Sequence, residues 1–261
     1  MNQESLQTSL IDLPIPALYY KESTTSTNSD ALELLEHGAS DSTLIVANHQ
    51  TAGRGRLDRK WITYPDSALA FSIIFRLIAK EVPSQPLFSP LGSLAVCQAI
   101  QQNYKIDAQV KWPNDVIVNR KKICGVLAES YWEESYLSGI VLGIGVNIAR
   151  DSLPSPDQLM FPATSLESEI GKSVKREDVL VCILTNLLSL RQKIRTKFFF
   201  DYWDSCLAFK NEKIILKKND NIAVIGTLKG INRNGDLILA LESGNEKTFQ
   251  IGDVKLRPQF H

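Results

Sequence analysis

Residues 139–148 alternate between bulky and small side chains, the pattern of a β-strand with one packed face and one nearly bare face. The packed face carries Ile140, Leu142, Ile144, Val146 and Ile148. The opposite face carries Gly139, Val141, Gly143, Gly145 and Asn147. Glycine weakens a strand, so three glycines at alternate positions indicate that a ligand or a tightly packed helix approaches the backbone. We expect a sheet built around this strand. The spacing alone does not decide whether a ligand or a helix approaches the glycines.

The remainder of the chain supplies further strands and helices. Strands are predicted over residues 18–21, 44–48 and 68–75. Amphipathic spacing predicts helices over 29–37, 90–104 and 174–203, the last as one long helix. Short strands separated by turn residues are predicted over 213–217, 222–228, 237–241 and 247–251. We therefore expect an α+β protein, with a mixed sheet flanked by helices over residues 1–210 and a small β-barrel over 211–261.

A loop rich in glycine and arginine follows the strand predicted at 44–48. Gly53, Arg54, Gly55 and Arg56 offer backbone N–H groups and guanidinium forks within four residues. Glycine permits backbone turns that direct successive N–H groups at an anion, and arginine binds phosphate or carboxylate bidentately. The run indicates an anion site, although mobile basic loops have the same composition.

A second motif comprises Lys111, Trp112, Pro113, Asn114 and Asp115. Pro113 biases Trp112 towards an extended backbone, and a lysine at such a constrained place supplies a compact cation for a carboxylate or phosphate. Taken alone, the pentapeptide also fits an ordinary strand end, with the tryptophan in the core and a turn after it.

Together the two motifs resemble the signatures of the biotin protein ligase family, which read Gly-Arg-Gly-Arg and Lys-Trp-Pro-Asn-Asp. The resemblance continues in the family's order through residues 26–28, 122–129, 143–148, 164–166 and 252–257. It covers nearly the whole chain from Ser26 onward. It implies a class II synthetase-like catalytic domain followed by an SH3-like C-terminal domain.

The resemblance also implies an ATP-dependent, AMP-forming ligase that uses Mg²⁺. Biotin and ATP would give biotinyl-5′-adenylate and pyrophosphate, and a lysine of a biotin carboxyl carrier protein would then take the biotinyl group. Lys111 and Arg56 are the implied catalytic residues, at the reacting carboxylate and phosphate. The implied binding residues are Ser26, Thr27, Asn28, Gln50, Arg54, Gly55, Arg56, Lys111, Gly125 and Asn147. Trp61 is expected either to wall the nucleotide side or to lie in the core.

Composition limits which classes of partner and which cellular compartment we expect for this chain. Lysine plus arginine equals aspartate plus glutamate at 29 each, whereas a nucleic-acid binder usually has a basic excess. Only 25 residues precede Ser26, too few for the winged helix of repressor-type ligases, so we expect a ligase without DNA binding. The four cysteines form no CxxC pair, and neither a signal peptide nor an apolar run of about 18 residues is present. We expect a cytoplasmic protein that binds no membrane; a homodimer is left open.

Two other functions are weighed against this one. A lipoate or octanoate ligase is related in fold, but those relatives lack the paired signatures. An RNA- or partner-binding protein would use Arg54 and Arg56 on phosphates, and the balancing acids argue against it. Asp58 stands where the family commonly has glycine, which predicts an effect on loop closure or ATP affinity.

Overall fold

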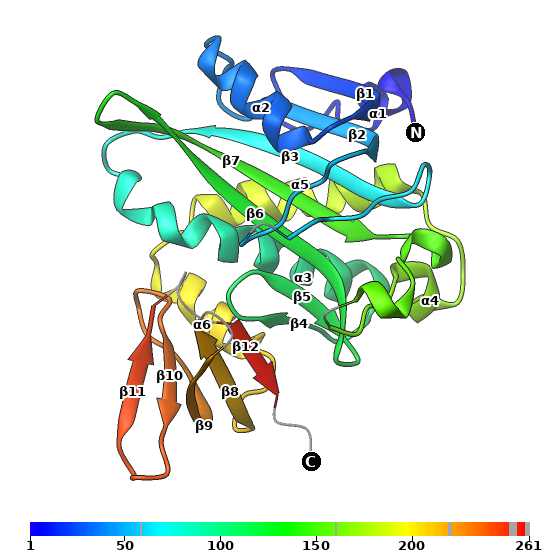
Figure 1. Cartoon of the computed structure of the whole chain (residues 1–261). Helices are drawn as coiled ribbons and strands as arrows, with labels where there is room; N and C mark the ends of the chain where they lie inside the picture. Colours follow the sequence, from blue (N-terminus) through cyan, green and yellow to red (C-terminus); the bar gives the residue numbers. More distant parts are fainter. Residues whose placement is uncertain (58, 160, 219–220, 251–254, 259–261) are drawn as a thin grey trace.

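The computed structural model describes residues 1–57, 59–159, 161–218, 221–250 and 255–258. Its centre is a seven-stranded mixed sheet in the order β1-β2-β3-β7-β6-β5-β4 (Figure 1). The strands are β1 (Leu18–Thr24), β2 (Leu44–Gln50), β3 (Ala68–Arg76), β4 (Ala108–Lys111), β5 (Asp115–Val118), β6 (Lys121–Glu133) and β7 (Tyr136–Asn147). Strands β1 and β2 are parallel and all other neighbours are antiparallel, so the expected mixed sheet is confirmed.

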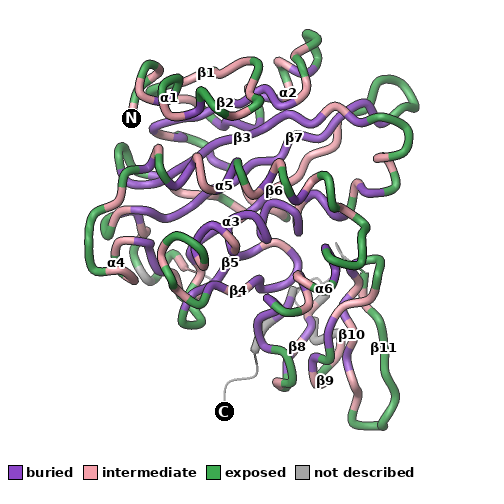
Figure 2. The backbone as a smooth tube through the Cα atoms, turned by 180° about the vertical axis from the view of Figure 1, so that it is seen from behind, coloured by how far each residue is buried: buried purple, intermediate pink, exposed green. Residues whose placement is uncertain are grey.

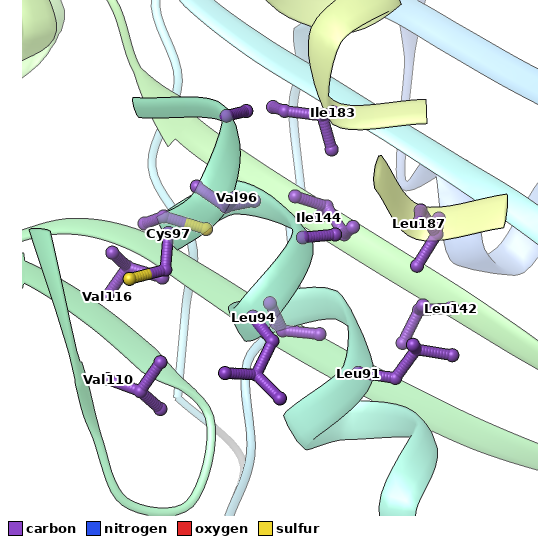
Figure 3. Close-up of a cluster of buried hydrophobic side chains, with 14 of the residues drawn as sticks. Leu91, Leu94, Val96, Cys97, Val110, Val116, Leu142, Ile144, Ile183 and Leu187 are labelled. Carbon is purple, nitrogen blue, oxygen red and sulfur yellow. The ribbon is translucent and has the colours of Figure 1, made fainter. Parts of the chain in front are cut away.

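Strand β7 lies in the middle of this sheet, between β3 and β6. Its even-numbered residues face α3 (Phe88–Tyr104) and α5 (Arg176–Arg191), where Leu142 and Ile144 meet apolar side chains of the two helices (Figure 3). Figure 2 shows β3 and β7 buried along most of their length. A buried strand with period-two alternation is what the sequence predicts for this segment.

The glycine-rich face of β7 is covered by α2 (Thr27–Glu36) and by the loop after β2. Here Ala31 and Leu35 pack on Ile45, Ile74 and Val141 as a small second core. A Cβ atom at Gly139 would lie 2.9 Å from Leu35 Cδ2, so part of the bare face accommodates a helix.

The remaining helices of the first part of the chain are short. They are α1 (Gln3–Ser9), α4 (Leu166–Ile170) and the 3₁₀ turns Val82–Leu87, Arg150–Ser152 and Pro156–Gln158. No helix among the described residues is long and apolar enough to cross a membrane.

The single long helix expected over 174–203 is wrong. The structure has two helices instead, α5 and α6 (Lys197–Ser205). Arg195 between them takes φ of 66°, a left-handed conformation that ends helical geometry, and the Thr196 side chain accepts a hydrogen bond from Phe199 N to start the next helix.

A five-stranded antiparallel sheet forms the end of the chain, in the order β11-β10-β9-β8-β12. Its strands are β8 (Lys213–Lys218), β9 (Asn221–Ile231), β10 (Leu237–Ala240), β11 (Glu246–Phe249) and β12 (Lys255–Pro258). The four predicted strands are present, with the end of the last one, residue 251, outside the described residues; β12 was not predicted. In Figure 1 this sheet lies beside the β4 edge of the large sheet.

Candidate functional site

One cavity gathers nine of the ten binding residues named from the sequence. They are Ser26, Thr27, Asn28, Gln50, Arg54, Gly55, Arg56, Lys111 and Gly125. The cavity lies on the glycine-rich side of the sheet, between the start of α2, the loop after β2 and the turn after β4. Its volume is about 120 Å³. This is smaller than the roughly 300–1,000 Å³ of typical small-molecule sites.

Neutral hydrogen-bonding groups line the end of the cavity at α2. The Oε1 atom of Gln50 accepts from Thr27 N at 2.8 Å and from Thr27 Oγ1 at 3.1 Å, so a side chain from β2 satisfies the first N–H of the helix. Ser26, at the N-cap position, makes no side-chain cap bond. This end offers hydroxyls and amides rather than charges.

Glycines of β7 and β6 let these groups lie flat on the sheet. A Cβ atom at Gly143 would stand 2.0 Å from Asn28 Oδ1, and one at Gly145 would stand 2.3 Å from the Trp61 ring. The bare face predicted from the sequence therefore belongs partly to the cavity. Trp61 lines it, and its buried Nε1 has no hydrogen-bond partner among the described residues.

Two lysines converge on one buried carboxylate at the centre of the site. Lys111 Nζ lies 3.3 Å from Asp115 Oδ2, and Lys122 Nζ lies 2.6 Å from Asp115 Oδ1. Burial opposes the charge on Asp115, but Lys122 and Lys111 override it and hold the pKa of this carboxyl well below its usual range. The carboxylate is thus ionised, and it keeps both ammonium groups in place inside the cavity.

Lys122 also lines the cavity and is not among the site residues predicted from the sequence. It belongs to the run 122–129 that carries part of the family resemblance. Its position depends on the antiparallel pairing of β5 with β6, which puts Asp115 opposite Gly125. The sequence signal available for this residue was the position of Lys122 three residues before Gly125, in a run that resembles the family.

The glycine- and arginine-rich loop folds back on itself beside these lysines. Gly55 N donates to Arg59 O at 2.7 Å, and Trp61 N donates to Gly53 O at 2.8 Å. Arg54 Nη2 binds Glu129 Oε2 at 2.8 Å. The effect predicted for Asp58 concerns a position outside the described residues.

The Arg56 side chain is less exposed than that of Arg54. Its Nη1 donates to Asn114 Oδ1 at 3.2 Å. Burial lowers the pKa of the Arg56 guanidinium, opposed by the charge of Asp115, and an arginine remains protonated under such a shift. The loop therefore presents a permanent cation near the two lysines.

Asn147 is the tenth candidate and is not among the residues lining the cavity. It lies at the end of the same strand face, where its Nδ2 donates to Thr164 O at 3.0 Å. Its role toward a ligand stays a prediction. The C-terminal sheet, by contrast, reaches the cavity through Leu256 of β12.

Residues 20–147 match the sequence profile of the biotin/lipoate A/B protein ligase family. The bifunctional ligase/repressor BirA of Bacillus subtilis is 31% identical over 246 residues, covering 92% of this chain and 74% of that protein. The biotin–[acetyl-CoA-carboxylase] ligase of Mycobacterium tuberculosis is 33% identical over 239 residues, covering 88% and 85%. The structure of biotin protein ligase from Aquifex aeolicus in complex with biotin and ATP superposes with a TM-score of 0.81 at 29% identity, covering 94% of this chain and 100% of that one.

Proposed function

Because the chain belongs to the biotin/lipoate A/B protein ligase family, we propose that it is an ATP-dependent biotin protein ligase. The observation that carries the proposal is one cavity in which Lys111 and Lys122, held by Asp115, stand beside the two arginines of the loop. A lipoate or octanoate ligase and an RNA- or partner-binding module fit less well, since the Mycobacterium tuberculosis relative and the Aquifex aeolicus structure are named as biotin ligases.

The first step joins two anions. A biotin carboxylate oxygen attacks the α-phosphorus of ATP, an O–P bond forms, and pyrophosphate leaves with the electron pair of the broken bond. The reacting groups repel each other, so fixed cations lower the barrier by neutralising both. We assign Lys111 to the carboxylate and α-phosphate, with Lys122 as a second cation, and Arg56, Arg54 and the Gly55 N–H group to phosphate. No general base is needed, since the carboxylate is already ionised at neutral pH.

The second step transfers the biotinyl group. The neutral ε-amine of a carrier-protein lysine attacks the acyl carbon, AMP leaves with the electron pair, and the new amide loses a proton to solvent. A mixed anhydride is prone to hydrolysis, so the loop protects it by excluding water until the carrier arrives.

The uncharged end of biotin is assigned to the neutral end of the cavity. Hydrogen-bonding side chains there are Ser26, Thr27, Asn28 and Gln50, which suit a ureido group that carries N–H donors and a carbonyl acceptor. Gly125 lines the cavity, and without a Cβ it lets Lys122 and Trp61 approach the backbone of β6: a Cβ there would stand 3.1 Å from Lys122 Nζ and 3.2 Å from the Trp61 ring. We assign this close-packed stretch of β6 to the ligand.

We propose that Mg²⁺ binds together with ATP, as part of that substrate. Asp115 lines the cavity and is paired with two lysines, and Glu129, which contacts two lining residues, is bound to Asn28 and Arg54. Across the described part of the chain no cluster of three or more potential metal ligands is found. These residues do not form a site for the ion, so no step is assigned to it.

We further propose that residues 1–210 form the catalytic domain and 211–261 an SH3-like domain that supports it. The hydrogen bond from Trp112 Nε1 to Gly235 O, at 3.0 Å, ties the two parts together next to Lys111. The partner is a biotin carboxyl carrier domain of a carboxylase, and the four unpaired cysteines favour a cytoplasmic protein.

The test is direct. The purified chain is incubated with ATP, Mg²⁺, biotin and a biotin carboxyl carrier domain, and the acceptor is analysed by intact mass spectrometry. The proposal expects the acceptor to gain one biotinyl group, and only when its target lysine is present. Modification with lipoate or octanoate but not with biotin would refute it.

A further inference from the structure

Glu129 lies outside the residues that line the cavity but binds two that do. It follows Gly125 and Leu127 on the same face of β6, just beyond the end of the cavity. Its Oε2 atom accepts from Asn28 Nδ2 at 2.6 Å and from Arg54 Nη2 at 2.8 Å. One carboxylate oxygen thus joins the neutral end of the site to the loop that carries the arginines.

The contact with Asn28 fixes the orientation of its amide. Asn28 Nδ2 donates to Glu129 and, more weakly, to Leu127 O at 3.4 Å, while Oδ1 accepts from Ser72 Oγ at 2.6 Å. The amide oxygen therefore lies over Gly143 and the amide nitrogen toward β6.

The contact with Arg54 makes Glu129 a competitor of any phosphate that binds to this arginine. The guanidinium is paired with a carboxylate, so an incoming anion has to exchange places with Glu129. The Arg54 and Glu129 side chains are 42% and 23% exposed. A partly exposed pair of this kind is weak enough to be exchanged by a ligand.

We propose that Glu129 is a positioning residue that holds the loop in a resting position through Arg54 and releases this arginine to the anion that binds in the cavity. That the anion is the phosphate of ATP rests on the function proposed above. The pairing of Glu129 with Arg54 does not depend on that function, so the pairing and the function can be tested separately.

The first test needs no ligand. Trypsin cleaves after Arg54 only when the side chain leaves its partner, and cleavage of a transiently opened segment follows the open population. Glu129→Gln keeps the size of the side chain and an acceptor for Asn28 but removes the charge. We expect the rate of cleavage between Arg54 and Gly55, followed by mass spectrometry, to rise about two- to fivefold.

A reciprocal control is available in the same chain. Arg120 is paired with Glu212 through two hydrogen bonds of 2.9 Å, far along the chain from the loop. Glu212→Gln is expected to speed cleavage after Arg120 and leave cleavage after Arg54 unchanged. In the wild type, raising NaCl from about 0.05 M to about 0.5 M is expected to speed cleavage after Arg54, relative to an unfolded peptide of the same sequence, because salt screens the pair.

The second test measures KM for ATP and for biotin. Glu129→Gln is expected to lower KM for ATP about two- to fivefold, since the competitor for Arg54 has lost its charge, and to leave KM for biotin within about twofold. A merely structural role would raise both KM values. Equal cleavage after Arg54 in wild type and Glu129→Gln, while the Arg120 control responds, overturns the proposal. A chain that shows the cleavage difference but no reaction with biotin and ATP refutes the proposed function and leaves the pairing standing.

Discussion

Arg56 Nη1 donates to Asn114 Oδ1 at 3.2 Å, which puts the glycine- and arginine-rich loop in contact with the motif that begins at Lys111. The two side chains are 58 positions apart in the sequence. Because Asn114 Nδ2 also donates to Val126 O at 2.6 Å, the asparagine is fixed to β6 and the arginine is fixed to it. The loop can therefore close on a rigid part of the site.

Removing this contact should release the activated intermediate. In Arg56→Gly the loop loses the side chain that anchors it, so we expect biotinyl-adenylate to leave before transfer and to label exposed lysines of unrelated proteins. Incubation with serum albumin, ATP and biotin, followed by a streptavidin blot, measures this labelling. Arg56→Lys, which keeps a cation, serves as the control; equal labelling of albumin by wild type and Arg56→Gly would contradict the assigned role.

Asp115→Asn should be destabilising at neutral pH. The substitution leaves Lys111 and Lys122 without the buried carboxylate between them, and breaking a buried ion pair typically costs about 3–5 kcal/mol. Urea unfolding at pH 7 measures the difference, with Asp12→Asn at an exposed position as the control.

The same variant predicts a pH dependence. The pKa of Asp115 in the folded chain is depressed below its ordinary value of 3.8, so its stabilising contribution is complete above pH 3.8 and is lost as the pH falls through the folded pKa. The stability gap between wild type and Asp115→Asn should stay constant from pH 7 to pH 5 and narrow below about pH 4. A gap of the same size at pH 3 and pH 7, with both proteins folded, would show that Asp115 is not the charged centre described here.

Gly143→Ala should impair biotin binding specifically. The added Cβ would stand 2.0 Å from Asn28 Oδ1, so the asparagine must move. If an overpacking cost of about 1–3 kcal/mol falls on biotin binding, KM for biotin rises about five- to 150-fold. Gly139→Ala is the matched control on the same strand face. There the Cβ meets Leu35 and Phe75 O, away from the cavity, so stability should fall while KM for biotin stays unchanged. Equal KM changes in both variants would argue against an Asn28 contact with biotin.

Trp112→Phe should loosen the C-terminal sheet from the site. The variant keeps most of the buried ring but leaves Gly235 O without its donor, which costs about 1–3 kcal/mol. Trp132→Phe, at a side chain 56% exposed, should change stability by less than about 0.5 kcal/mol. Thermal unfolding of the two variants measures both effects, and similar losses in the two would contradict the contact.

Much of the fold is predictable from the sequence because it depends on local periodicity. Strand β7 is the clearest case, since alternation along 139–148 names both its buried face and its bare face. The prediction fails where a single residue changes the backbone. The three- to four-residue spacing of apolar side chains continues from Leu190 to Ile194, past the end of α5 at Arg191, and that spacing does not reveal the left-handed Arg195.

The site is predictable where motifs carry it, and less so where strand pairing decides it. Residues of both signatures line one cavity. Lys122 and Glu129 lie in a run that resembles the family, yet their partners follow from the register of β6 and from the approach of the loop. Asn147 lies on the strand face predicted by the alternation but is not among the residues that line the cavity, and its role toward a ligand stays a prediction.

We expect Lys111 to stand at the reacting carboxylate and phosphate. The most direct measurement is biotin-dependent exchange of labelled pyrophosphate into ATP, comparing wild type with Lys111→Ala, with circular dichroism to show that both chains are folded. We expect exchange that requires biotin in the wild type and a loss of at least about a hundredfold in the variant, as when one charge-stabilising group is removed. Exchange that is independent of biotin, or that survives in Lys111→Ala, would show that Lys111 does not carry biotin adenylation.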